Sequence, residues 1–99
     1  MIAPKSMGAD VPARDLLFVT TPALWPAWPF LPVIRHTRGA EALGLMFDAR
    51  GAAGRSGYDL TVFLGNLFDL PAGLDAFLAL PRETFETTYA LLAAGWRVD

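Results

Sequence analysis

The sequence predicts an α+β fold in which a small antiparallel β-sheet of three to five strands carries a C-terminal α-helix packed on one face. Apolar and polar residues alternate in two segments, 43–49 and 58–64, and the spacing of apolar residues becomes helical after Pro81. The length of 99 residues suits one domain. We place this domain at 14–99, behind a flexible tail at 1–13 that carries scattered proline, glycine and charged residues.

The most regular predicted element is a hairpin. Leu43, Leu45 and Phe47 alternate with other residues in its first strand, and the second strand repeats the pattern up to Leu64. Matching the apolar faces of the two strands pairs Leu43 with Leu64. The glycine-rich residues 51–57 are then the turn between the strands.

Two further strands are predicted before this hairpin. Residues 16–21 are short and rich in β-forming side chains, and residues 30–37 form a second run of the same kind. Pro32 lacks a backbone donor, so we expect this second strand to lie at an edge of the sheet or to begin at Val33.

The last part of the chain predicts helical structure. Residues 74–80 suit a short helix, and Pro81 suits the first position of a longer helix that ends at Gly95. Residues 96–99 are expected to add a last short strand. The predicted core under the C-terminal helix consists of Leu45, Phe47, Leu60, Val62, Phe85 and Leu92.

The most unusual segment is 22–29, which contains two tryptophans and three prolines and is followed by Phe30. Prolines at this spacing exclude a regular helix and predict an extended segment on the surface. A stiff aromatic segment is typical of a binding surface, because its side chains lose little freedom on binding. Trp25, Trp28 and Phe30 are therefore the candidate partner-binding residues. The interpretation favoured for the segment itself is that it covers the open face of its own sheet, because a single helix covers only part of a sheet face.

Composition favours a protein as the partner. Hydrophobic residues make up 54% of the chain, more than one small core readily hides, which predicts an exposed apolar surface. The net charge of −2 argues against the basic surface typical of nucleic-acid binding. The leading hypothesis is a small bacterial protein-interaction module that binds a protein partner, or a second copy as a homodimer, with Trp25 or Trp28 near the centre of the interface.

A small enzyme, such as a metal-dependent hydrolase, is the alternative hypothesis. The predicted hairpin register places Asp48 opposite Asp59, with His36 on a neighbouring strand. Facing carboxylates can raise one pKa for acid–base chemistry or hold a hard cation. The same aspartates fit a solvated turn neutralised by Arg50 and Arg55. We favour the solvated turn, and expect a binding protein without enzymatic activity, metal site or cofactor.

The expected location is the bacterial cytoplasm. The uncharged stretch 16–34 has the length of a membrane span, but its four prolines argue against a spanning helix. The N-terminus lacks the apolar region of a signal peptide, and the absence of cysteine excludes a disulfide framework. Lys5 is the single lysine beside seven arginines, a bias typical of GC-rich bacterial genes.

Overall fold

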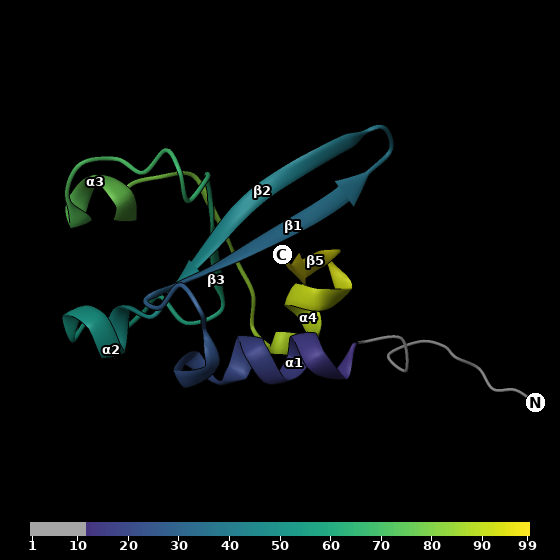
Figure 1. Ribbon diagram of the computed structural model, residues 1–99, viewed down its shortest axis with the longest axis horizontal. Coiled ribbons are helices and arrows are strands. Elements are labelled where there is room, and N and C mark those ends of the chain that lie inside the picture. The colour runs from purple at the N-terminus through teal and green to yellow at the C-terminus, as the bar shows by residue number, and fades with distance from the viewer. Residues whose placement is uncertain (1–11) are drawn as a thin grey trace, which may run out of the picture.

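The computed structural model describes residues 12–99, and the flexible tail predicted for 1–13 lies almost entirely outside this range. Five strands form one antiparallel sheet in the order β4-β3-β2-β1-β5, which confirms the predicted α+β class (Figure 1). The strands are β1 (Phe30–Thr37), β2 (Ala40–Phe47), β3 (Thr61–Leu64), β4 (Arg82–Thr84) and β5 (Trp96–Val98). The helices are α1 (Ala13–Thr20), the 3₁₀ helix η2 (Pro22–Leu24), α2 (Ala49–Ala53), α3 (Leu74–Leu78) and α4 (Thr88–Ala93).

Strands β1 to β4 form a meander, since strands that are consecutive in the sequence are also neighbours in the sheet. The longest pair is the β1–β2 hairpin, which closes through the two-residue turn Arg38-Gly39. Gly39 has a φ of +66°, a conformation that glycine adopts without strain. This hairpin precedes the predicted one, and β5 then returns to pair with β1.

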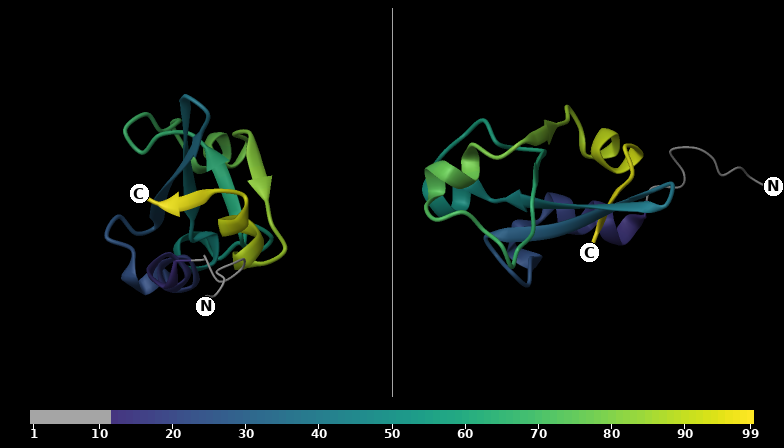
Figure 2. Two further views of the ribbon diagram at one scale, coloured as in Figure 1. Left: turned by 90° about the vertical axis from the view of Figure 1, so that its right-hand side faces the viewer. Right: turned by 90° about the horizontal axis from the view of Figure 1, so that it is seen from above.

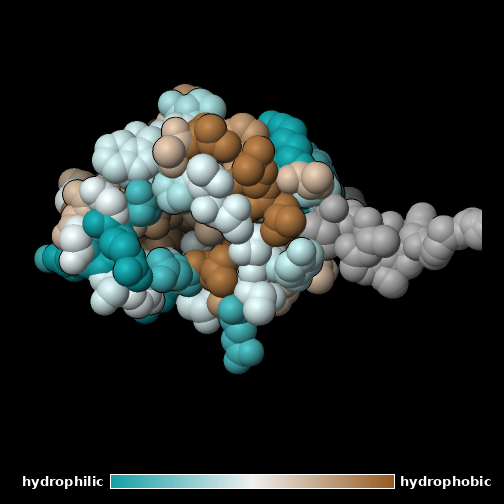
Figure 3. Space-filling view, turned by 90° about the horizontal axis from the view of Figure 1, so that it is seen from below, coloured by the Kyte–Doolittle hydropathy of each residue, from teal (hydrophilic) through white to brown (hydrophobic). Residues whose placement is uncertain are grey.

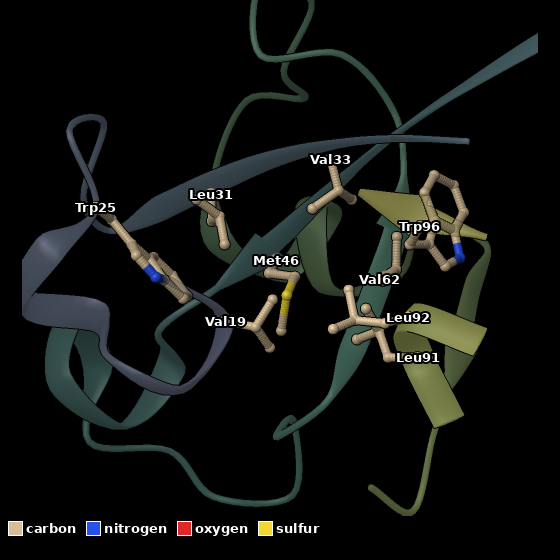
Figure 4. Close-up of a cluster of buried hydrophobic side chains, with 9 residues drawn as sticks. All are labelled: Val19, Trp25, Leu31, Val33, Met46, Val62, Leu91, Leu92 and Trp96. Atoms are coloured by element: carbon tan, nitrogen blue, oxygen red, sulfur yellow. The ribbon is translucent and has the colours of Figure 1, made fainter. Parts of the chain in front are cut away.

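Helices cover both faces of the sheet (Figures 1 and 2). One face, with Val33 and Met46, packs against α1 and α4, and Figure 4 shows these side chains converging. This α1/α4 core consists of Val19, Trp25, Leu31, Val33, Met46, Val62, Leu91, Leu92 and Trp96. On the other face α3 packs on a second group of side chains. This α3 core consists of Leu45, Phe47, Ala49, Phe63, Phe77 and Leu78.

Burial on both faces overturns the predicted single core and the predicted register. Leu45 pairs with Phe63 rather than with Val62, a shift of one residue. The single predicted core is wrong because Leu45 belongs to the α3 core and Val62 to the α1/α4 core. Alternation identifies a register only where one face is buried, and here Val62 and Phe63 are both fully buried.

The first predicted strand is wrong, because residues 13–20 form helix α1. The helix places Val19 in the α1/α4 core, and this tertiary packing outweighs the β propensity of a short run. The side chain of Asp15, in its first turn, is buried and accepts a hydrogen bond from the backbone N–H of Val98 at 3.2 Å. Helix α1 therefore also covers the outer edge of β5.

The predicted turn at 51–57 and the predicted long C-terminal helix are also wrong. Helix α2 occupies the first part of that turn. Residues 82–84, predicted as helix, form β4, and the carbonyl of Pro81 accepts a ladder bond from the Leu64 N–H at 2.8 Å. Helix α4 is consequently short. The predicted stop at Gly95 is confirmed by its φ of +103°, and the last short strand is confirmed as β5.

Pro32 lies in an interior strand, not at an edge, because β1 pairs with both β2 and β5. Its carbonyl accepts a hydrogen bond from the Asp99 N–H at 3.0 Å. The ring nitrogen therefore faces the position just past the end of β5, where the missing donor breaks no regular ladder bond. Residues 22–29, predicted to be extended, instead form η2 and turns, since Pro22 suits the first position of a helix.

Candidate functional site

The face that carries α1, α2 and α4 has a hollow of about 300 Å³, which is visible in Figure 3. Five segments surround it: the end of α1, the 3₁₀ helix η2, the end of β2, the loop before β3 and the start of α4. Its apolar lining is Val19, Pro22, Trp25, Met46, Phe47 and Leu60, and its polar lining is Thr20, Asp48, Tyr58, Asp59 and Thr88. Among the described residues that line the hollow, none is lysine, arginine or histidine.

The structure separates the three aromatic residues proposed for partner binding. Trp25 is buried in the wall of the hollow, where its indole N–H donates to the Phe18 carbonyl at 2.6 Å. Trp28 is 50% exposed, and its indole N–H donates to Asp48 Oδ2 at 2.9 Å. Phe30 is half-buried against the α3 core, with its ring centroid 5.2 Å from that of Phe47. Trp28 is thus the exposed aromatic residue next to the hollow.

Asp48 holds the rim of the hollow in place. It is the N-cap of α2, and its Oδ1 accepts a hydrogen bond from the Gly51 N–H at 3.0 Å. Aspartate is a favoured N-cap because its carboxylate satisfies a backbone donor that the first turn leaves free. With Oδ2 bound to Trp28, both oxygens have donors, and each donor is uncharged. Neither donor brings a positive charge to this carboxylate at the rim.

Asp59 contributes the second carboxylate. It lies in the loop before β3, and its Oδ2 accepts a hydrogen bond from Arg50 Nη2 at 3.2 Å. The predicted cross-strand pairing of Asp48 with Asp59 is wrong, because Asp48 caps a helix and Asp59 belongs to no strand. The two residues still line the same hollow, through loop and helix geometry that the hairpin prediction did not contain.

His36 lies away from both carboxylates. It is near the tip of the β1–β2 hairpin, where its Nδ1 is 3.5 Å from Glu41 Oε2. His36 is six positions along the strand from Phe30, at the end of β1 that pairs with Phe47 beside Asp48, a distance of about 20 Å. Within residues 12–99 no three histidine, aspartate or glutamate side chains gather as metal ligands.

A second polar cluster lies on the α1/α4 face and joins the two edges of the sheet. Glu83 is on edge strand β4 and Trp96 on edge strand β5, yet the indole N–H of Trp96 donates to Glu83 Oε1 at 3.2 Å. Arg35 of β1 donates two hydrogen bonds to the same carboxylate, at 3.0 and 2.8 Å. We call Arg35, Glu83 and Trp96 the clasp.

The clasp packs tightly around the Trp96 ring. The Arg35 guanidinium stacks 4.4 Å from the ring centroid, a cation–π contact. On β2 the ring lies over Gly44, where an added Cβ would be 3.2 Å from two of its atoms. The hydrogen bonds from Arg35 lower the pKa of Glu83, and the bond from Trp96 adds to this effect against the opposing effect of burial. This polar cluster therefore links the edge strands β4 and β5 to each other and to β1.

None of the helices within residues 12–99 has the length and apolar character that crossing a membrane requires. Compared with known proteins, the chain matches no family model, no curated protein and no solved structure. Function is therefore inferred from the chemistry of the hollow. An apolar floor beside two carboxylates suits a ligand that carries both an apolar group and a positive charge.

Proposed function

We propose that this chain is a small protein-interaction module that binds, in the hollow, a partner segment with an apolar side chain next to a lysine or arginine. The main support for this proposal is the lining of the hollow, in which apolar residues lie beside the carboxylates of Asp48 and Asp59. Its volume of about 300 Å³ is at the lower end for ligand sites, which favours one or two side chains of a partner over a large cofactor.

The contact between Arg50 and Asp59 supports exchange with a partner's cation. Their side chains are 68% and 73% exposed, and exposed ion pairs of this kind contribute about 1 kcal/mol or less. A cationic side chain that enters the hollow therefore replaces Arg50 on Asp59 at little cost. Asp48 adds a second negative charge whose present donors are neutral N–H groups.

Trp28 supports the proposal as an aromatic anchor. Its indole is held by Asp48, so little side-chain freedom remains to be lost on binding. Leu17 and Leu24, on α1 and η2, are also substantially exposed. Figure 3 shows an apolar band beside the hollow. An apolar surface with a charged margin is the usual composition of a protein-binding site.

The cellular setting is part of the proposal. The single lysine beside seven arginines supports a bacterial origin, and we propose the cytoplasm as the location. Fractionation of the source cells, with detection of the endogenous chain, tests the location. Recovery of the chain outside the cytoplasmic fraction contradicts it.

A hydrolase that uses Asp48, Asp59 and His36 is the weaker proposal. His36 lies about 20 Å along β1 from the end of the strand nearest Asp48. Asp48 is engaged as a helix cap and Asp59 with Arg50, whereas acid–base catalysis needs these groups within reach of one another and of a substrate.

Selection of random peptides on the intact chain tests the proposal. We expect the enriched peptides to share a large apolar residue next to lysine or arginine. Enrichment of acidic or uncharged peptides, or of none, contradicts the proposed chemistry of the hollow. The strongest binder is then titrated by calorimetry against three variants that each change one exposed charge.

The three variants have expected effects of different sign. Asp59→Asn should weaken binding several-fold, because it removes the exchangeable carboxylate. Arg50→Ala should strengthen binding, because it removes the competitor for that carboxylate. Arg55→Ala is the matched control, since Arg55 pairs with Asp75 instead and does not line the hollow. Weaker binding by Arg50→Ala, or equal changes in both arginine variants, contradicts the proposal.

A further inference from the structure

A second groove, of about 200 Å³, lies on the other side of the β1–β2 hairpin from α1. It is formed by the middle of the hairpin and the segment between β3 and α3, which Figure 1 shows above the sheet. Its lining is Pro32, Val33, Leu43, Gly44, Leu45, Gly65, Asn66, Leu67, Phe68 and Asp99. Of these described residues only Asp99 carries a charge.

Phe68 stands at the rim of this groove with 93% of its surface exposed, the highest value among the large hydrophobic residues described. Its backbone is held in a defined turn. Asn66 Oδ1 accepts a hydrogen bond from the Phe68 N–H at 2.9 Å, and the Asn66 carbonyl accepts one from the Asp69 N–H at 3.0 Å. The Gly65 N–H donates to the Leu43 carbonyl at 3.1 Å, which fixes the turn to β2. The chain thus presents this ring to solvent from an ordered loop.

We propose that two copies of this chain form a two-fold symmetric dimer in which Phe68 of each copy enters the groove of the other. An apolar projection beside an apolar groove makes one surface complementary to itself, which is the requirement for an isologous interface. Leu43, which lines the groove, is 40% exposed and extends the apolar area there. Large aromatic residues that fill pockets near the centre of an interface contribute most to its affinity.

Charge distinguishes this surface from the hollow. A two-fold axis at the hollow would bring the like charges of Asp48 and Asp59 close to their own copies, and like charges facing each other oppose association. Of the described residues that line the Phe68 groove only Asp99 is charged, whereas two carboxylates line the hollow, so fewer like charges face each other across a two-fold axis at the groove. Together with the self-complementary shape of projection and groove, this favours a second copy as the occupant of the Phe68 surface, whereas the hollow fits a basic partner. The dimer does not depend on the proposed function of the hollow.

Sedimentation velocity of the full chain, over a range from about 1 to 100 µM, tests this dimer. We expect a concentration-dependent dimer for the wild type and at least about thirtyfold weaker association for Phe68→Ser, the loss typical of a central anchor. Because Phe68 is almost fully exposed, the variant should keep its fold, which its melting temperature checks. Trp28→Ala is the control and should still dimerise.

Two results overturn the proposal. A wild-type monomer at 100 µM excludes the dimer, and dissociation by Trp28→Ala but not by Phe68→Ser moves the interface to the hollow.

Discussion

Two pairs of residues in this protein make the same hydrogen bond in opposite surroundings. In the clasp the indole N–H of Trp96 donates to Glu83, and at the hollow the indole N–H of Trp28 donates to Asp48. Trp96 is 0% exposed, whereas Trp28 is 50% exposed. The same kind of hydrogen bond therefore joins the edge strands of the sheet in the clasp and fixes an exposed side chain at the rim of the hollow.

The difference between the two pairs is the arginine. Arg35 makes two hydrogen bonds to the Glu83 carboxylate and stacks on the Trp96 ring, so the charge is neutralised and the ring is covered. At the hollow, Asp48 has only neutral donors, and Arg50 bonds to Asp59 instead. The clasp is therefore complete within the chain, while the hollow retains negative charge and aromatic surface for a partner.

The largest expected difference between the clasp and the hollow is in the loss of stability when Trp96 or Trp28 is replaced by alanine. Trp96→Ala empties a fully buried site, and we expect it to lower the free energy of unfolding by about 3–5 kcal/mol. Trp28→Ala removes a half-exposed ring and one hydrogen bond, with an expected loss of about 1–2 kcal/mol. Urea unfolding measures both. Equal losses for the two variants would contradict the division into a closed and an open pair.

Gly44→Ala should disturb the clasp by crowding the Trp96 ring from strand β2. An added Cβ would clash with Val62 Cγ1 and lie 3.2 Å from the Trp96 ring, so the strands or the ring must move. Overpacking of this kind costs about 1–3 kcal/mol, which thermal or urea unfolding detects. Gly65→Ala is the matched control, because its Cβ would meet only Leu80 at an ordinary 3.6 Å. A Gly44→Ala variant as stable as the control would show that the ring does not pack on this strand.

Glu83→Gln should remove an acid-sensitive part of the stability. The pKa of Glu83 lies below its ordinary value of 4.5, chiefly because Arg35 donates to the carboxylate. This stabilisation is therefore complete above pH 4.5 and decreases as the pH falls through the lowered pKa. At pH 7 the wild type should be the more stable protein, and in urea unfolding its advantage over Glu83→Gln should shrink below about pH 4.5. An advantage that stays constant down to pH 3 contradicts this account of the clasp.

Trp28→Phe should give the smallest change in stability. The variant keeps an aromatic ring and loses the hydrogen bond to Asp48, which contributes about 0.5–1.5 kcal/mol at most and less where water replaces it. We expect unfolding to change little and the affinity for a selected peptide to fall, because the rim is no longer held. An unchanged affinity measured by calorimetry would show that the held indole is not part of the binding surface.

The sequence predicts the fold class and several elements correctly, and the reasons are local. Phe30–Thr37 is a strand because its residues favour extended backbone, and Gly95 ends a helix because glycine adopts a positive φ. The register between β2 and β3 is not predictable from alternation, since consecutive residues of β3 are buried on both faces. The β propensity of residues 16–21 is outweighed by packing in the α1/α4 core.

The sites are less predictable than the fold. Trp28, Asp48 and Asp59 stand out in the sequence by residue type, but their meeting at one hollow depends on α2, which replaces the predicted turn. The clasp has no local signal, because Arg35 and Glu83 are 48 positions apart and Glu83 resembles a helix N-terminal residue. Residue chemistry is visible in a sequence, whereas the contacts between distant segments are set by the tertiary structure.

The most direct test of the central claim follows the indole N–H signals of Trp25, Trp28 and Trp96 by two-dimensional NMR. The intact chain is titrated with a capped tripeptide that carries arginine between two leucines, and with the same tripeptide carrying glutamate instead. We predict that the arginine peptide shifts the Trp28 indole signal most and leaves the Trp96 signal in place, and that the glutamate peptide shifts neither. A shift of Trp96 without Trp28, or equal responses to both peptides, would contradict the claim that the clasp is closed and the hollow is open to a basic partner.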